Sequence, residues 1–195
     1  MTELESFDRA ALLIIDMQRG MAMERAGARN NPQAEQNISQ LLSLWRRRHL
    51  GLVHIRHISR DRESLFWPGQ EGVEFQVDFA PLPEEHVVEK NVPDALINTG
   101  LERWLRIRGL SQLVITGVST NNSVEATART AGNLGFDVYV VEDATFTFDM
   151  WDYRGNHRTA ADLHSFSLAN LSGEYAQIVA TSDLSTSLMK EGIQC

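Results

Sequence analysis

Three residues suited to hydrolytic chemistry stand at comparable places in this chain, each close behind a short apolar run. Asp16 follows ALLII, Lys90 closes VVEK, and Ser123 follows LVITG and a polar turn. A carboxylate can act as a general base or acid, a serine hydroxyl can act as a nucleophile, and an ammonium group stabilises negative charge. A fold that brings these three side chains together would form a hydrolytic site.

The segment Leu113–Ala144 carries the strongest local signal. A buried-type strand at Leu113–Thr116 runs through a glycine into the polar turn Val118–Asn122, and a helix is expected to start at Ser123. Backbone N–H groups converge at a helix N-terminus and favour negative charge there. A nucleophile at Ser123 would therefore have an oxyanion site beside it.

Each of these residues also has an ordinary structural explanation. An acid at the end of a strand is often a helix cap or a loop residue, and a lysine such as Lys90 is often a solvated loop residue. Ser123 could cap the helix that follows it, since serine is favoured at that position. The joint placement of Asp16, Lys90 and Ser123 behind three strands is what favours a site.

Strand-like apolar runs alternate with segments of helical period along residues 1–195, and no repeat, linker or shift in composition divides them. We therefore expect one domain with a three-layer α/β fold, a mostly parallel sheet and helices on both faces. Right-handed crossovers place the carboxyl ends of all strands on one edge, where ligands bind. The predicted strands are Ala11–Ile15, Gly51–Ile58, His86–Glu89, Leu113–Thr116, Val138–Val141 and Tyr175–Val179. The predicted helices are Pro32–His49, Asn98–Arg108, Val124–Leu134 and Thr159–Leu171.

Substrate specificity is expected to come from loops at the same edge. The long stretch Arg60–Pro83, rich in proline and glycine, reads as a lid or binding loop. The candidate substrate-binding residues are Phe66, Trp67, Asn91, Asn122, Phe146 and Phe148. An aromatic cleft with few polar anchors suits a small, fairly apolar amide or ring compound. Some of these aromatics could instead pack the core or a subunit interface, and Asn122 could instead cap the helix.

Composition and charge narrow the class of protein. The net charge is −8, and the basic residues are scattered apart from Arg46–Arg48 at a predicted helix end, so nucleic acid is not an expected partner. The acidic N-terminal stretch has an apolar run too short for a signal peptide or a membrane span. Cys195 is the sole cysteine, which gives no disulfide framework and makes it a poor catalytic candidate. We expect a cytoplasmic protein without membrane association.

Metal and cofactor binding are not expected from the sequence. There is no GxGxxG after the first strand, so a dinucleotide site is unsupported. His54 and His57 lie three apart within a predicted strand, and would face opposite sides of it. We interpret both as packing or hydrogen-bonding residues, and His164, in the middle of a predicted helix, as structural.

Three stretches resemble motifs of the isochorismatase-like, or cysteine hydrolase, superfamily. They are LLIIDMQRGM around Asp16, VVEKNVPDAL around Lys90 and ITGVSTNNSVEATARTAGNLGF around Ser123. The tail from DATFTFD to HSFSLANLSGEYAQIVAT also fits, so the resemblance covers nearly the whole chain. It implies a Rossmann-like hydrolase fold, a small-molecule substrate and a homo-oligomer, either a dimer or a tetramer. Trp151 and Tyr153 in the loop Thr147–His157 are candidates for the subunit contact.

The resemblance also implies roles for individual residues. Asp16 would be the general base that activates the nucleophile and later the acid for the leaving group, and Lys90 would hold the site in register. Ser123 occupies the nucleophile position, where most amidases of the superfamily have cysteine. A cis peptide between Val118 and Ser119 would aim the N–H groups of Ser119 and Ser123 at the oxyanion.

The serine at this position leaves several functions open. A serine hydroxyl is far less acidic than a thiol and needs a well-aligned base. Ser123 is explained by a natural subgroup with different or weaker chemistry, by an engineered replacement of cysteine, or by a non-catalytic ligand-binding protein, and we favour a natural serine. The expected activity is hydrolysis of a C–N bond in an amide or carbamoyl group. The alternative is vinyl-ether hydrolysis of the isochorismate type by Asp16 and water, with Ser123 lining the pocket.

Overall fold

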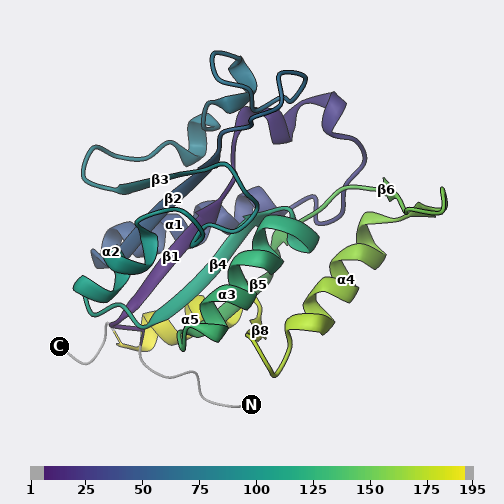
Figure 1. Cartoon of the computed structure of the whole chain (residues 1–195). Helices are drawn as coiled ribbons and strands as arrows, with labels where there is room; N and C mark the ends of the chain where they lie inside the picture. Colours follow the sequence, from purple (N-terminus) through teal and green to yellow (C-terminus); the bar gives the residue numbers. More distant parts are fainter. Residues whose placement is uncertain (1–6, 192–195) are drawn as a thin grey trace.

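The protein has a six-stranded parallel sheet, as seen in a computed structural model that describes residues 7–191 (Figure 1). Cys195 lies outside the described residues. The strand order is β3-β2-β1-β4-β5-β8, and all five neighbouring pairs are parallel. The predicted α/β fold with a mostly parallel sheet is confirmed. The strands are β1 (Ala10–Ile15), β2 (Gly51–His57), β3 (His86–Lys90), β4 (Gln112–Val118), β5 (Asp137–Phe146) and β8 (Gln177–Val179).

Helices cover both faces of the sheet and create two hydrophobic cores. The helices are α1 (Ala34–Arg48) and α5 (Thr181–Glu191) behind the sheet in Figure 1, and α2 (Leu101–Ile107), α3 (Glu125–Asn133) and α4 (Ala160–Leu171) in front of it. The central strand β1 is buried along its whole length, as expected for a parallel strand covered on both sides. Its alternate side chains divide between the two cores, with Leu12 and Ile14 under α1, and Leu13 and Ile15 on the α2–α3 side.

Most predicted elements differ from the observed ones by one or two residues at an end, and two of them differ by more. The strand predicted at Val138–Val141 continues to Phe146, because β5 resumes pairing with β4 after an irregularity in its register. Asn31 supports this irregular stretch by donating side-chain hydrogen bonds to backbone carbonyls of β5. The helix predicted at Asn98–Arg108 begins later, at Leu101, because Asn98 has a positive φ of 57° that no helical residue adopts.

Two elements were not predicted at all. The C-terminal helix α5 packs against α1 and β5. A short hairpin of β6 (Met150–Trp151) and β7 (His157–Arg158) forms an arm that projects from the body beside α4 (Figure 1). No helix within residues 7–191 is both long and apolar enough to span a membrane.

The predicted loop Arg60–Pro83 is folded against the carboxyl edge of the sheet. It contains two 3-10 turns, Glu71–Val73 and Val77–Phe79, and the first packs on a third turn at Arg19–Ala22. The blue and purple segments at the top of Figure 1 form this cap. Gln18, three residues beyond the end of β1, is fully buried and fixes the cap, because its side chain donates to the carbonyl of Val73 at 2.8 Å.

Candidate active site

Lys90 contacts both of the other residues that the sequence singled out, Asp16 and Ser123. Its Nζ lies 2.7 Å from Oδ2 of Asp16 and 3.2 Å from Oγ of Ser123, and donates a hydrogen bond to each. All three residues are buried, with exposed fractions of 1% for Asp16, 2% for Lys90 and 6% for Ser123. The predicted convergence of three strand ends on one crevice is confirmed.

The central strands place Asp16 through an unusual backbone conformation. Asp16 follows β1 directly and has a φ of +52°, a left-handed value that aspartate tolerates better than most residues. Its N–H is tied to the carbonyl of Ile55 at 2.9 Å, which holds that conformation. On the other side of β1, Gly117 has a φ of +108°, and a Cβ there would lie 2.1 Å from the carbonyl oxygen of Ile15. Only glycine lets β4 approach β1 so closely beneath the site.

The turn that carries Ser123 has the predicted cis peptide between Val118 and Ser119. The predicted helix start at Ser123 is wrong. A π-helical turn occupies Thr120–Val124, and α3 proper begins at Glu125 with no side-chain cap, so Ser123 does not serve as a cap. π-helical turns occur frequently at functional sites. That the N–H groups of Ser119 and Ser123 face a common point stays a prediction.

Helix α4 anchors this turn from outside. Thr120 Oγ1 lies 2.8 Å from Nδ1 of His164, and the hydroxyl of Ser167 donates to the carbonyl of Thr120 at 2.9 Å. The carboxylate of Glu125 also lies 2.6 Å from this hydroxyl, so the two acceptors share its single proton. His164 is therefore structural, as predicted, because it fixes the start of the turn that presents Ser123.

Electrostatics at the site favour a carboxyl group that can both accept and donate a proton. Burial raises the pKa of Asp16 above its ordinary value, and the neighbouring charge of Lys90 offsets only part of that rise. The hydroxyl of Ser123 also lowers this pKa. Among the described residues, Oδ1 of Asp16 has no hydrogen-bond partner, so one carboxylate oxygen is available for proton transfer.

The aromatic candidates divide between the cap and the core. Phe66 is half-buried in the cap, edge-on to the imidazole of His57 at 6.0 Å, and Trp67 is half-buried beside it in sequence. Phe146 is fully buried and belongs to the core on the α1 side of the sheet. Phe146 lies in the core because β5 extends to that residue. Phe148 lies edge-on to Phe146 at 5.8 Å and is half-buried, so of these two rings it is the one that keeps some exposure.

The predicted polar anchors lie nearer the surface. Asn91 directly follows Lys90, and Asn122 directly precedes Ser123. Both asparagines are exposed. Their role in substrate binding stays a prediction. Asn121 is half-buried and accepts a hydrogen bond from the hydroxyl of Thr147, which ties the nucleophile turn to the base of the β6–β7 arm.

The interpretation of the two strand histidines as packing or hydrogen-bonding residues on opposite faces of β2 is confirmed, since His54 contacts Glu85 and His57 packs against Phe66. His54 is fully buried, and its Nε2 lies 2.8 Å from the carboxylate of Glu85, which Arg46 also holds at 2.7 and 2.9 Å. His57 also lies close enough to Asp16 and Lys90 for both charges to act on it. The alternation of side chains along β2 was a signal for this placement, but the register of β2 against β3 was not available from the sequence. Within the described part of the chain, no group of three or more histidine, cysteine, aspartate or glutamate residues is arranged to hold a metal ion.

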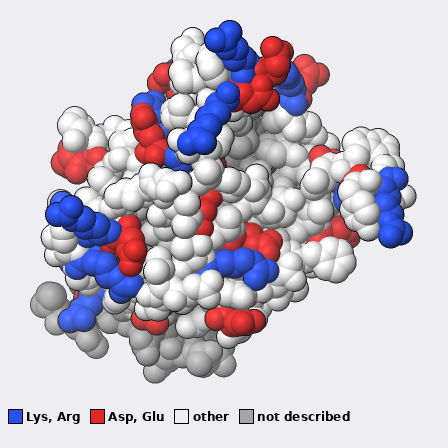
Figure 2. Space-filling model, in the orientation of Figure 1, with Lys and Arg blue, Asp and Glu red and all other residues white. Residues whose placement is uncertain are grey.

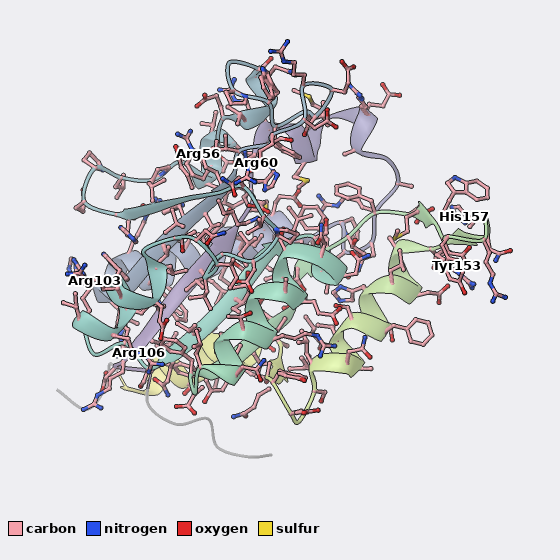
Figure 3. The ribbon with its side chains drawn as sticks, in the orientation of Figure 1. Arg56, Arg60, Arg103, Arg106, Tyr153 and His157 are labelled. Carbon is pink, nitrogen blue, oxygen red and sulfur yellow. The ribbon has the colours of Figure 1, made fainter. Side chains whose placement is uncertain are left out.

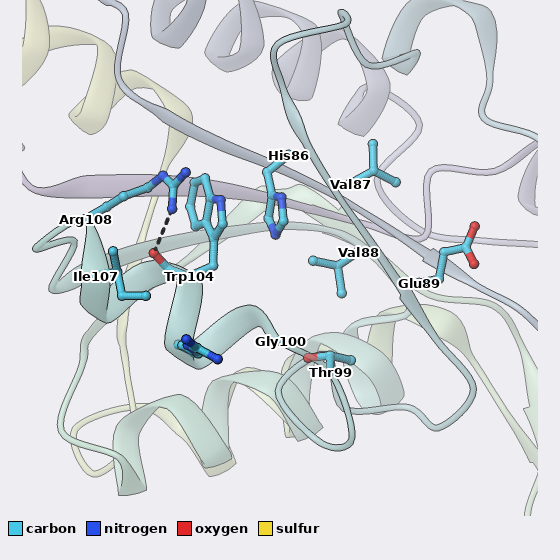
Figure 4. A pocket seen from close by; sticks show the side chains of 10 residues that line it. His86, Val87, Val88, Glu89, Thr99, Gly100, Trp104, Ile107 and Arg108 are labelled. Carbon is cyan, nitrogen blue, oxygen red and sulfur yellow. Dashed lines mark hydrogen bonds between the residues drawn. The ribbon is translucent and has the colours of Figure 1, made fainter.

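A surface cavity of about 430 Å³ lies away from this crevice, between the edge strand β3 and α2 (Figure 4). The rings of His86 and Trp104 stack there at 4.4 Å, and the guanidinium of Arg108 covers the other face of Trp104 at 4.3 Å. Asp16, Lys90 and Ser123 do not line it. We therefore place the candidate active site by the hydrogen bonds of Lys90 to Asp16 and Ser123, and not by this cavity.

The structure thus defines a class of α/β protein in which a parallel sheet carries a buried Asp16–Lys90–Ser123 cluster past the carboxyl ends of its strands. The profile of the Isochorismatase domain family matches residues 10–183. The chain belongs to the isochorismatase family of hydrolases.

Individual relatives agree with this assignment. The isochorismatase family protein YrdC of Bacillus subtilis (strain 168) is 39% identical over 183 residues, which cover 94% of this chain and 98% of that protein. A crystal structure of an isochorismatase-family hydrolase from Chromobacterium violaceum ATCC 12472 superposes with a TM-score of 0.91 at 47% identity, covering 96% of this chain and 97% of that one. Streptothricin hydrolase of Streptomyces noursei is 32% identical over 142 residues, covering 72% of this chain and 50% of that protein.

The buried ion pair leads to a prediction on stability. Lys90→Met should lower the free energy of unfolding by about 3–5 kcal/mol, because it leaves the buried Asp16 carboxylate without its partner. Adding Asp16→Asn to Lys90→Met should restore part of that loss, since no buried charge remains. Denaturant unfolding of the single and double variants measures both effects.

The exposed Arg103→Met variant, which also replaces a cation with methionine, is the control and should change stability by less than about 0.5 kcal/mol. A Lys90→Met protein as stable as the wild type would show that the pair at 2.7 Å does not hold the site together.

Proposed function

We propose that the protein hydrolyses a C–N bond in an amide or carbamoyl group of a small molecule, with Ser123 as the nucleophile. The observation that carries this proposal is the position of Lys90 Nζ, within hydrogen-bond distance of both Asp16 and Ser123 in a buried crevice. This arrangement places a proton acceptor, a positive charge and a hydroxyl around one point, which acyl transfer requires.

In the first half of the reaction, Asp16 takes the proton of the Ser123 hydroxyl while Oγ attacks the carbonyl carbon of the substrate. The carbonyl oxygen becomes an oxyanion, which Lys90 and the N–H groups of Ser119 and Ser123 stabilise. Asp16 then gives its proton to the substrate nitrogen, the C–N bond breaks, and the amine leaves. The product of this half is an ester between the acyl group and Ser123.

In the second half, water attacks the ester while Asp16 takes one of its protons. The tetrahedral intermediate collapses, Asp16 returns the proton to Oγ of Ser123, and the acid leaves. The raised pKa of Asp16 supports its use as both base and acid. A carboxyl group with an ordinary pKa holds a proton too weakly at neutral pH to take it from a hydroxyl and pass it on. The relative named streptothricin hydrolase supports a hydrolytic role on a small molecule.

The second candidate is vinyl-ether hydrolysis, in which Asp16 protonates the substrate and water attacks. The unpartnered Oδ1 of Asp16 favours this reading, because an oxygen free of hydrogen bonds can carry the proton that is delivered. Ser123 would then only line the pocket, and its poorly acidic hydroxyl would not need to ionise. A ligand-binding protein without turnover is the third reading, and the same site geometry would serve it.

Variants of Ser123 and Asp16 separate these readings. Under the covalent route, Ser123→Ala should lose nearly all turnover of a small-amide panel, and no acyl-enzyme should appear in its mass spectrum. Asp16→Asn should lose about 10²–10⁴-fold in kcat under either enzymatic route, because both need its proton transfer. Ser123→Cys should retain or raise activity, since a thiol ionises more readily.

Ser111→Ala and Asp137→Asn, which lie at the opposite edge of the sheet, are the matched controls and should keep wild-type rates. Full activity of Ser123→Ala would exclude the covalent route in favour of water attack. Full activity of Asp16→Asn would exclude both routes, and turnover only in Ser123→Cys would mark a protein without a working nucleophile.

We also infer a homo-oligomer in which the β6–β7 arm contacts a second copy. Trp151 and Tyr153 on this arm are 68% and 90% exposed, and Figure 3 places Tyr153 at its outer end, away from the body. Figure 2 shows the arm as a separate projection with basic side chains at its edge, on a chain whose net charge is −8. A two-strand hairpin is marginal by itself, and exposed aromatics are favoured interface anchors.

Light scattering after size exclusion checks this inference. The wild type should be a dimer or tetramer at micromolar concentration, and the Trp151→Ser/Tyr153→Ser variant should shift toward the monomer. Ile107→Ser, which removes an equally exposed apolar side chain from α2, should leave the mass unchanged. A monomeric wild type would rule out the oligomer, and an unchanged mass of the double variant would rule out the arm as its contact.

A further inference from the structure

His57 belongs to the active crevice through its place on β2. It pairs in register with Lys90 on β3, so the two backbones lie side by side at the carboxyl edge of the sheet. Val53 and Ile55 of β2 and Val88 of β3 face the core on the α2–α3 side. Because side chains alternate along a strand, His57 and Lys90 share that same face.

The surroundings of the His57 ring agree with this placement. The charges of Lys90 and Asp16 both act on the ring, and Phe66 of the cap meets it edge-on at 6.0 Å. The backbone of Val92, just beyond Lys90, acts on the ring in the direction that raises its pKa, as a nearby carbonyl acceptor does. The imidazole is half-buried, so it is neither sealed in the core nor free in solvent.

The backbone of His57 is held by the side chain of Gln18. The side chain of Gln18 accepts a hydrogen bond from the His57 N–H at 2.8 Å and donates one to the His57 carbonyl at 3.0 Å. Gln18 directly follows Met17 after Asp16 and is itself fully buried. One residue thus couples the ends of β1 and β2, and sets the position of His57 relative to Asp16.

The surroundings of His57 favour the uncharged form of its ring. Burial lowers the pKa of His57 below its ordinary value, and the positive charge of Lys90 lowers it further, against an opposing effect of Asp16. A neutral imidazole has one donor and one acceptor nitrogen. A neutral ring with its proton on the nitrogen that faces the Val92 backbone presents its other nitrogen as a hydrogen-bond acceptor.

We propose that His57 is a specificity-determining residue, which accepts a hydrogen bond from an N–H of the substrate's amide or carbamoyl group and so selects nitrogen leaving groups over oxygen ones. The inference deepens the proposed function and rests on it for the reaction that is selected. An ester or vinyl ether presents only an acceptor oxygen at the same place, and two acceptors cannot pair. Phe66 would form the apolar wall beside this contact, which leaves Asp16 and Ser123 free for the chemistry.

The test uses benzamide and methyl benzoate, which share their acyl group and differ in the leaving group. The rates of ammonia and methanol release are measured for the wild type, His57→Phe, His57→Gln and the control His86→Phe. His57→Phe keeps an aromatic ring beside Phe66 but removes both nitrogens, whereas His57→Gln keeps an acceptor oxygen. His86 lies at the amino end of β3, outside the crevice.

His57→Phe should lower kcat/KM for benzamide by about tenfold, which corresponds to one neutral hydrogen bond, and should leave methyl benzoate within about twofold. His57→Gln should lose less on benzamide than His57→Phe, and His86→Phe should match the wild type on both compounds. Equal losses on the two compounds, or unchanged benzamide kinetics in His57→Phe, would overturn the proposal.

A binding experiment separates this inference from the proposed function. Benzamide is titrated into Ser123→Ala and into Ser123→Ala/His57→Phe, followed by ligand-observed NMR. If the wild type does not hydrolyse benzamide, the proposed function fails on this probe, and weaker binding to the double variant still supports the role of His57. Equal binding to both proteins, or binding to neither, overturns it.

Discussion

The buried ion pair between Lys90 and Asp16 is the interaction on which the rest of the site depends. The two charged groups lie 2.7 Å apart, and the exposed fraction of the side chain is 0% for Lys90 and 2% for Asp16. Each charge is therefore stabilised by the other rather than by water. Removing charges from water is costly, and only close pairing with further hydrogen bonds offsets that cost. The pair therefore fixes an edge strand and a central strand relative to each other, and the second hydrogen bond of Lys90 brings in Ser123.

Three parts of the surrounding fold hold the residues around the Lys90–Asp16 pair in place. The close approach of β4 to β1 at Gly117 sets the level at which the nucleophile turn leaves the sheet. From the outside, α4 holds that turn through His164 and Ser167. Gln18 fastens the cap and the end of β2 over the crevice. The chemistry therefore relies on side chains whose own positions are fixed by buried hydrogen bonds, which is what a preorganised site needs.

The sequence predicts the sheet and the meeting of Asp16, Lys90 and Ser123 because these follow from local patterns. Apolar runs mark the strands, and parallel topology brings strand ends to one edge. The place of His57 depends on strand register, which is a long-range property that no local pattern encodes. The burial of Phe146 depends on an irregularity in β5 that Asn31 supports from a distant loop. The π-helical turn at Ser123 likewise depends on anchors from α4.

If Asp16 begins the reaction as an ionised base, the pH dependence of kcat/KM for a hydrolysed amide must follow the ionisation of its carboxyl group. Because burial raises the pKa of Asp16 above its ordinary value of 3.8, the carboxylate form is lost as pH falls through that raised value. We therefore expect kcat/KM to rise with pH on the acid side, with a midpoint above 3.8, toward a plateau. A rate that falls as pH rises through the same range would mean that protonated Asp16 is the active form, and would exclude Asp16 as the initial base.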